Sequence, residues 1–324
     1  MSERKIKNVG ASVRERLLML ARERREDFNF ILNTYGVERL LYRLSQSAHN
    51  DRFILKGAML FTVWGDRPHR PTRDLDLLGR GHNRVAAVEQ TFREICETRV
   101  EDDGLEFDPG SIRGEQIQTD DEYDGVRLTL TAHLARARIP LQVDVGFGDS
   151  IVPAPEVVAY PVLLPLPEPR VHAYPKEAVV SEKYQAMVQL GMGNSRMKDF
   201  YDLWILGRRF EFDGSALARS IQATFDTRKT PLPAQLPLGL TPGFHDDTAK
   251  QAQWRAFVGR GRLEENPPGL AEVASILVGF LMPPTLALVD SGRFEGFWPP
   301  GGPWGRRGAP HSGGAQIIFR RRRR

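Results

Sequence analysis

The sequence predicts an α+β fold, with strands in the N-terminal half of the 324 residues and a helical C-terminal half. Three observations carry this prediction. Two helical segments precede the first strand, two β-rich runs near the middle of the chain form a hairpin, and the periodic segments after residue 175 have helical spacing. Hydrophobic residues make up 41% and charged residues 27% of the chain, which is typical of a globular protein with a buried core.

The N-terminal segment that precedes the first strand is predicted to consist of two helices. Ser12 and Glu15 form a capping-box pattern, after which apolar residues recur at helical spacing. From Phe28 to Leu44, apolar residues share one helical side. We therefore expect both helices to pack on the first domain.

The first domain is predicted to alternate short strands with helices. Phe53 to Leu55 and Arg73 to Leu78 are expected strands, and Met59 to Trp64 and Arg84 to Glu97 are expected helices. Two longer β-rich runs, joined by a short basic connection, then predict an antiparallel hairpin of residues 126–134 and 139–147.

A Pro-rich stretch, 153–175, suits a crossing segment or an edge strand and marks the predicted domain boundary. Helices are expected beyond it at residues 176–190, 197–208, 215–224, 250–258 and 270–281. The prediction thus divides the chain into N-terminal helices (1–50), an α/β domain (51–165), a C-terminal helical domain (170–290) and a disordered Gly/Pro/Arg-rich tail (291–324).

Charge and cysteine content limit the classes of function. The net charge of +4 becomes −1 without the terminal run Arg320 to Arg324, so a nucleic-acid site must be a local patch, for which Arg67 to Arg73 is a candidate. The single cysteine, Cys96, excludes a disulfide framework and a Cys-rich zinc site. With no signal-peptide core and no apolar run of membrane-spanning length, we expect a cytoplasmic protein.

The strongest chemical feature is RPTRDLDLLG, residues 70–79. Asp74 and Asp76 lie two residues apart on an expected strand, so their carboxylates point to one face. Two adjacent carboxylates need a cation, and hard oxygen ligands of this kind suit Mg²⁺ or Mn²⁺ in phosphoryl chemistry. The alternative is a solvent-facing strand with two ordinary surface aspartates.

Two further features favour the metal site over that alternative. Lys56 and Gly57 stand where a strand meets a helix, and glycine there lets the backbone approach a phosphate at the helix start. Asp144 alternates with apolar residues on an expected core strand, where an unpaired carboxylate would be costly. We expect Asp144 to be a third metal ligand or a general base, and Asp149 to be a turn residue.

The last group of candidate functional residues lies in SEKYQAMVQLGMGNSRMKDFYDLW, residues 181–204. Asp199 and Asp202 are one turn apart and share a helix side, so an interhelical salt-bridge set explains them structurally. The functional alternative places Lys183 on nucleotide phosphates and lets Asp199 fix or deprotonate a reacting group.

Taken in order, LKGAMLF, RPTRDLDLLG, QVDVGF and SEKYQAM with RMKDFYDL resemble the motifs of AbiEii/AbiGii-type toxins, a family of DNA polymerase β-like nucleotidyltransferases. The resemblance covers about Arg52 to Leu206, and FWPPGGPW resembles the end of that family. It implies a nucleotidyltransferase domain with a mixed sheet, a C-terminal helical bundle and an active site in the cleft between them.

The resemblance also implies roles for individual residues. Asp74 and Asp76 would bind metal, Lys183 would contact the triphosphate, and Asp199 would be needed for activity. Thr72 and Arg73 of the second motif and Lys198 complete the expected nucleotide-binding set. One departure concerns Ala58, where many relatives carry Ser, Thr or Gly, so the hydroxyl contact to phosphate is missing and backbone amides would replace it.

The function implied is that of a toxin in a toxin–antitoxin or phage-defence (abortive infection) pair. It would use Mg²⁺ and a nucleoside triphosphate to add a nucleotide to the 3′ end of tRNA, releasing pyrophosphate, with a cognate AbiEi-type antitoxin as partner. Other RNA, a protein side chain or a small molecule are further acceptors to consider. The rival readings are a nucleotide-sugar glycosyltransferase with an Asp-x-Asp metal site, and a noncatalytic partner-binding protein.

Overall fold

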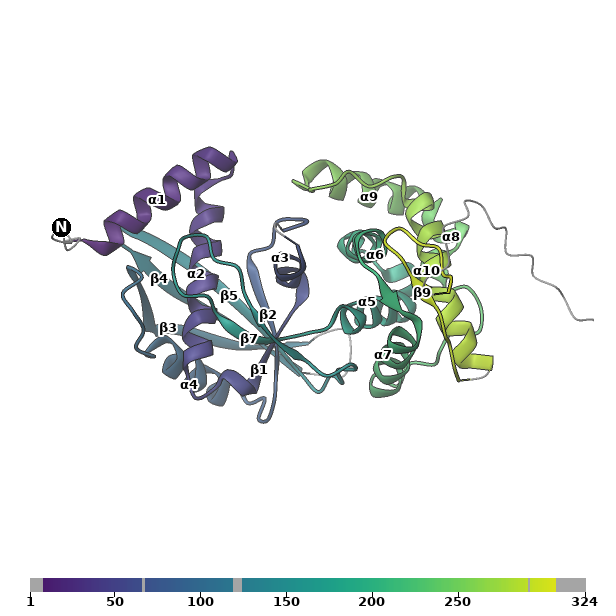
Figure 1. The fold of residues 1–324 in the computed structure, drawn as a ribbon, viewed down its shortest axis with the longest axis horizontal. Helices are drawn as coiled ribbons and strands as arrows, with labels where there is room; N and C mark the ends of the chain where they lie inside the picture. The colour runs from purple at the N-terminus through teal and green to yellow at the C-terminus, as the bar shows by residue number, and fades with distance from the viewer. Residues whose placement is uncertain (1–7, 66–67, 119–123, 291, 307–324) are drawn as a thin grey trace, which may run out of the picture.

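A computed structural model describes residues 8–65, 68–118, 124–290 and 292–306. Its N-terminal half is built around one large sheet and its C-terminal half is helical (Figure 1). The predicted α+β fold class is therefore confirmed, including the mixed sheet.

Seven strands form the sheet: β1 (Phe53–Lys56), β2 (Asp74–Gly79), β3 (Leu105–Gln118), β4 (Asp124–Leu134), β5 (Ala137–Phe147), β6 (Glu156–Ala159) and β7 (Arg170–Ala173). Their order is β3-β4-β5-β2-β1-β7-β6. β2 is parallel to β5 and antiparallel to β1, and β1 is parallel to β7, so the sheet is mixed. The predicted hairpin is the pair β4 and β5.

The helices of the sheet half are α1 (Val9–Arg24), α2 (Phe28–Gln46), α3 (Leu60–Trp64) and α4 (Val85–Cys96). Those of the helical half are α5 (Lys176–Leu190), α6 (Met197–Arg209), α7 (Gly214–Thr227), α8 (Pro242–His245), α9 (Thr248–Arg260) and α10 (Leu270–Asp290). A small second sheet pairs β8 (Phe212–Asp213) with β9 (Phe297–Trp298).

Helices α2 and α4 cover one face of the large sheet. A Cβ added at Gly36 of α2 would lie 3.0 Å from Leu141 of β5, and one at Gly114 of β3 would lie 2.7 Å from Val85 of α4. Side chains alternate along a strand, so the residues on this covered face are the odd-numbered ones of β2 and β5, including the buried Leu75. The even-numbered residues, among them the three aspartates of the motifs, lie on the opposite face.

Three local predictions need correction. The first helix begins at Val9 rather than at Ser12, because Asn8 is the N-cap and accepts a hydrogen bond from the amide of Ala11. Strand β3 was not predicted, since its sequence mixes charged residues and glycines without clear alternation. Helix α10 does not end at Leu281 but continues through two prolines, Pro283 and Pro284.

Helix α10 also has the length and hydropathy of a membrane span, contrary to the expectation that no such run exists. Its most apolar window has a mean hydropathy of 1.8 and is 44% buried inside the molecule. It packs against α6 and α7, which is the environment of a core helix. Length and composition alone are weak evidence for a membrane segment.

The closing segment packs on the helical half. The indole of Trp298 donates a hydrogen bond to the carbonyl of Gly207 at 2.6 Å, and that of Trp304 donates to the carbonyl of Phe280 at 2.9 Å. Buried indole N–H groups usually find such partners, and here they fix the chain up to Arg306 on α6 and α10. The remainder of the predicted tail, residues 307–324, lies outside the described residues.

Candidate active site

A row of charged side chains crosses the face of the sheet opposite α2 and α4. In register, Arg127 of β4 stands beside Asp144 of β5, Asp144 beside Asp76 of β2, and Asp76 beside Lys56 of β1. Residues paired across neighbouring strands share a face, so the row places two carboxylates between two cations. The structure thus brings together three residues that the sequence predicted separately, and Asp74 adds a fourth from the same face of β2.

Asp74 and Asp76 differ from the other carboxylates around them. Within the described part of the chain, neither makes an ion pair within 4.0 Å, and no side-chain hydrogen bond to either is found. Desolvation, reinforced by the neighbouring Asp144, raises the pKa of the half-buried Asp76 to about 6 against the opposing charge of Lys56, and it raises the pKa of the more exposed Asp74 as well. Lys198, exposed at the start of α6, opposes this shift at both aspartates, so its charge acts on this site.

Asp144 is paired, in contrast. Arg127 donates two hydrogen bonds to it, Nε at 2.9 Å and Nη2 at 2.8 Å. The hydrogen bond to Asp144 raises the pKa of the Arg127 guanidinium further above its usual value. Arg127 was not among the predicted site residues, because nothing local in the sequence shows that it stands opposite Asp144.

These residues fit a divalent cation in their chemistry. Asp74 and Asp76 supply carboxylate oxygens, the ligands that Mg²⁺ and Mn²⁺ prefer. A desolvated carboxylate with a raised pKa is an anion short of positive charge, which a bound cation would provide. Among the described residues, no group of three His, Cys, Asp or Glu side chains is arranged to hold a metal ion, and Asp144, the nearest further carboxylate on this face, is paired with Arg127.

Gly57 is in contact with Asp76. Its φ of +75° is in the region that favours glycine, and a Cβ added there would lie 2.1 Å from Oδ2 of Asp76. The carboxylate therefore occupies the space that any other residue at 57 would fill. The phosphate contact of Gly57 remains a prediction. The structure shows a different role for this glycine, which is to leave room for the side chain of Asp76.

Lys56 points to carboxylates on other elements. Its Nζ lies 2.9 Å from Asp149 and 3.2 Å from Glu182 of α5. Arg228 also pairs with Asp149, at 3.0 Å, and the two cations outweigh burial and lower the pKa of Asp149 to about 2. Asp149, interpreted from the sequence as a turn residue, is thus the centre of a cluster that joins the sheet to α5 and to the end of α7.

A second ionic cluster surrounds the next residue of α5. Nζ of Lys183 lies 2.5 Å from Asp199 and 2.9 Å from Asp202, both on α6. Burial would lower the pKa of Lys183, but these two carboxylates outweigh it and raise the pKa. The interhelical salt-bridge set considered from the sequence is therefore present. Its presence leaves the predicted roles of Lys183 and Asp199 in nucleotide transfer untested.

Asp202 extends this cluster to the loop before β2. It accepts hydrogen bonds from His69 and Arg70, and its side chain is fully buried. The sequence showed neither partner, because they are more than 130 residues away along the chain.

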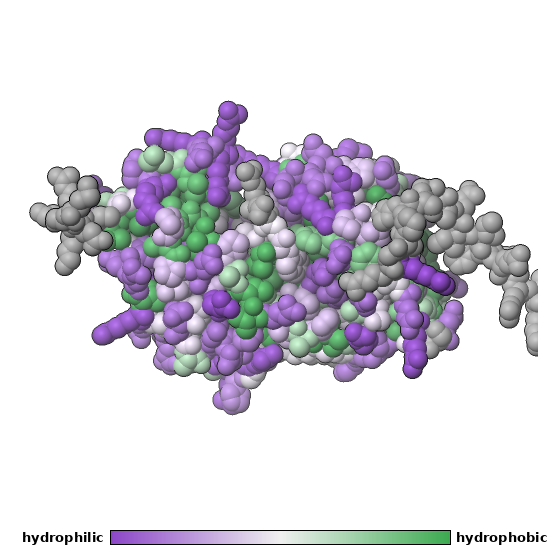
Figure 2. Space-filling view, in the orientation of Figure 1, coloured by the Kyte–Doolittle hydropathy of each residue, from purple (hydrophilic) through white to green (hydrophobic). Residues whose placement is uncertain are grey.

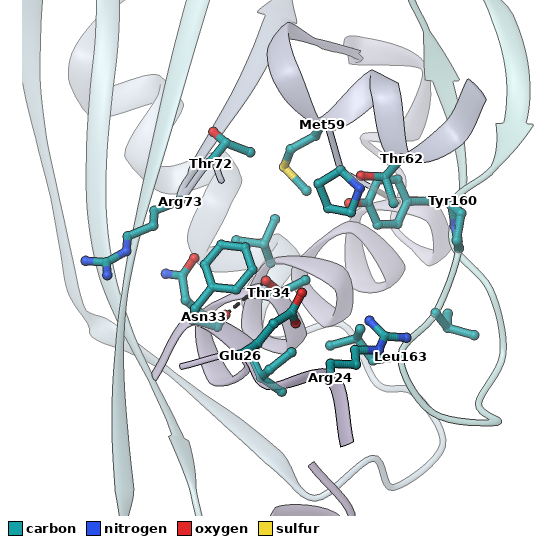
Figure 3. Close-up of a pocket in the computed structure, with 16 residues that line it drawn as sticks. Arg24, Glu26, Asn33, Thr34, Met59, Thr62, Thr72, Arg73, Tyr160 and Leu163 are labelled. Carbon is teal, nitrogen blue, oxygen red and sulfur yellow. Dashed lines mark hydrogen bonds between the residues drawn. The ribbon is translucent and has the colours of Figure 1, made fainter. Parts of the chain in front are cut away.

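Thr72 and Arg73, predicted to bind nucleotide, line a cavity of about 110 Å³ between α2, α3 and the loop after β6 (Figure 3). Figure 3 shows Met59 and Thr62 on one side of it, Asn33 and Thr34 on the other, and the guanidinium of Arg73 directed away from its centre. The three aspartates of the sheet face are not among its lining residues. The cavity lies beside the start of β2 and not over the acidic row.

A larger groove of about 900 Å³ adjoins this cavity and shares Arg73 with it. The groove runs between helix α1 and the end of helix α9, and these two helices face each other across the top of the molecule (Figure 1). Five arginines line the groove, together with four acidic residues: Arg24, Arg70, Arg73, Arg260 and Arg262, with Glu23, Glu26, Asp27 and Glu264. Figure 2 shows hydrophilic side chains over both of these upper rims.

Comparison with known proteins gives one family. The family model described as "Nucleotidyl transferase AbiEii toxin, Type IV TA system" matches residues 39–276. No curated protein matches the chain.

Two solved structures from Helicobacter pylori match this chain. One is JHP933, with 15% identity over 75% of this chain and 87% of that chain and a TM-score of 0.45. The other is described as a candidate nucleotidyltransferase, with 15% identity over 82% of this chain and 98% of that chain and a TM-score of 0.46.

Proposed function

The chain belongs to the AbiEii family of nucleotidyltransferase toxins, and we propose that it uses a divalent cation to transfer a nucleoside monophosphate from a nucleoside triphosphate to the 3′ end of tRNA. The resemblance drawn from the motifs is confirmed by the family model. Membership implies a cognate antitoxin and a nucleotide substrate. The cation and the tRNA acceptor are the parts that we propose.

One observation carries the proposal of a cation. Among the carboxylates clustered at the sheet and at α6, Asp144, Asp149, Asp199 and Asp202 are each paired with Lys or Arg, whereas Asp76 is partly buried and has no such pair in the described part of the chain. Leaving a desolvated carboxylate without an ion-pair partner is unfavourable, and proteins retain such groups chiefly at functional sites.

In the proposed reaction, an acceptor hydroxyl oxygen forms a bond to the α-phosphorus while the bond from that phosphorus to the bridging oxygen breaks and pyrophosphate leaves. Asp74 and Asp76 would hold Mg²⁺ or Mn²⁺, whose charge stabilises the attacking and leaving oxygens. Lys198 would bind the triphosphate, because its charge already acts on both aspartates. Asp144 would take the hydroxyl proton or complete the cation site, and Lys183 would offset the charge of the leaving pyrophosphate.

The acceptor is inferred from the groove between α1 and α9. Four of its arginines, Arg24, Arg73, Arg260 and Arg262, make no ion pair within the described residues. The four carboxylates of the same lining leave the groove a small formal excess of positive charge, and arginines without an ion-pair partner are suited to phosphates along a polynucleotide backbone. Because Arg73 directly precedes Asp74, a strand bound in this groove would lead to the proposed site.

The test is a labelling assay with purified protein, Mg²⁺, total bacterial tRNA and each α-labelled ribonucleoside triphosphate in turn. Wild type is compared with Asp74→Ala, Asp76→Ala and the control Glu101→Ala, which changes an exposed acid. We expect label on tRNA with wild type and the control, and none with the aspartate variants or after chelation of the cation. Label on protein and not on tRNA would show that the acceptor is a protein. Full labelling of tRNA by both aspartate variants would overturn the proposed site.

A further inference from the structure

Asp202 is saturated by three basic side chains in the interior. Its Oδ1 accepts hydrogen bonds from Nε2 of His69 at 2.6 Å and from Nε of Arg70 at 2.7 Å. Its Oδ2 accepts one from Nη2 of Arg70 at 2.9 Å and lies 2.9 Å from Nζ of Lys183. Since its exposed fraction is 0%, Asp202 has neither a free oxygen nor the access needed to touch a substrate.

Each partner of Asp202 is tied to a different part of the candidate site. Arg70 lies four residues before Asp74, on the connection that leads into β2. Lys183 also contacts Asp199. The ring of His69 stacks on Phe61 of α3, with ring centroids 3.5 Å apart, and α3 follows the turn that contains Gly57. One carboxylate therefore links the segment before β2, the turn that contains Gly57 and the paired helices α5 and α6.

The charge of Asp202 is needed to hold these groups together. Burial alone would raise its pKa, but Lys183 and Arg70 outweigh burial and hold the pKa well below its usual value. Arg70 is 12% exposed and pairs with no other carboxylate among the described residues. If Asp202 were neutral, the largely buried Arg70 would lose its ion-pair partner among the described residues, which is strongly unfavourable.

We propose that Asp202 is a positioning residue, which holds Lys183 on the site and fixes the 69–73 segment so that Asp74 and Asp76 are aligned for transfer. This inference rests on the proposed function. Lys183 contacts two buried carboxylates, Asp199 and Asp202, and of these only Asp202 also binds the 69–70 segment that leads into β2.

The experiment compares Asp202→Asn with Asp103→Asn. Asp103 is a matched control, because it is 3% exposed and pairs through both oxygens with Arg43, at 2.8 and 3.1 Å, on the side of the sheet covered by α2. Both variants should lose stability in thermal unfolding. Only Asp202→Asn should also lose kcat in the labelling assay, by about 10²-fold, as expected for a small misplacement of reacting groups.

A second measurement does not depend on activity. NMR of ¹³C-labelled lysine side chains follows the titration of Lys183, which should move to lower pH in Asp202→Asn because one of its two carboxylate partners is neutralised. An unshifted titration, or equal losses of kcat in both variants, would overturn the positioning role. If wild type transferred no nucleotide but the titration of Lys183 still shifted, the proposed function would be wrong. The contact between Asp202 and Lys183 would nevertheless be established.

Discussion

The carboxylate of Asp76 lies against Gly57, with Oδ2 2.1 Å from the point where a Cβ would stand. A substitution at 57 must therefore move Asp76 or the turn that follows β1, and either change affects the proposed cation site. This relationship connects two motifs that are separated in sequence by 19 positions.

Gly57→Ala should lower both stability and nucleotide transfer. Gly81→Ala is the matched control, because Gly81 also has a positive φ, +91°, but no atom lies within 4 Å of its added Cβ. Both variants carry the backbone strain, about 1–3 kcal/mol of unfolding free energy in denaturant titrations. Only Gly57→Ala should lose transfer in the labelling assay. Equal activity of the two variants would show that the contact with Asp76 has no functional role.

Asp76→Asn should strongly reduce transfer without destabilising the fold. The amide has nearly the shape of the carboxylate but no charge to desolvate, so the temperature of unfolding measured without Mg²⁺ should be unchanged or higher. Transfer should fall by on the order of 10²-fold or more, as when a charge-stabilising group is removed from other active sites. A clear decrease in the unfolding temperature would indicate that Asp76 has a structural role instead.

Local patterns were sufficient to predict much of the fold and the strand that carries the aspartate pair. Helix α5 has the expected bounds, and β2 is within one residue of them. The alternation that placed Asp74 and Asp76 on one face depends only on strand geometry, which a short segment determines by itself.

The partners of these residues could not be predicted, because they depend on register and on long-range packing. Arg127 meets Asp144 only because β4 and β5 pair in one register. His69 and Asp202 are 133 residues apart, and Lys56 reaches Asp149 across 93 residues. Asp149 looked like a turn residue in its local sequence, and its role as an ionic centre appears only when β1, α5 and α7 converge.

Protons and Mg²⁺ should compete for Asp76. Its pKa of about 6 means that transfer should fall as the pH decreases through that value, because the protonated carboxyl cannot bind a cation. A higher Mg²⁺ concentration favours the ionised form and should move this limb of the pH–rate profile to lower pH. Initial rates between about pH 5 and 8 at two Mg²⁺ concentrations test this, and a limb that stays in place would argue against ligation by Asp76.

Asp149 should make the free energy of unfolding depend on pH in the acidic range. Its folded pKa of about 2 is below the ordinary 3.8, so its contribution is fully present above pH 3.8 and is lost as the pH falls through 2. Asp149→Asn leaves Lys56 and Arg228 with fewer counter-charges, and removing one partner of a buried ion pair costs about 3–5 kcal/mol. The free energies of unfolding of wild type and variant, measured in urea, should therefore differ most at neutral pH and converge in strong acid.

Asp51→Asn is the control, because Asp51 is 90% exposed and its change should give a small, nearly constant difference in the free energy of unfolding. If the gap for Asp149→Asn did not narrow toward pH 2, the ion pairs with Lys56 and Arg228 would not be what stabilises the junction of the sheet with α5 and α7.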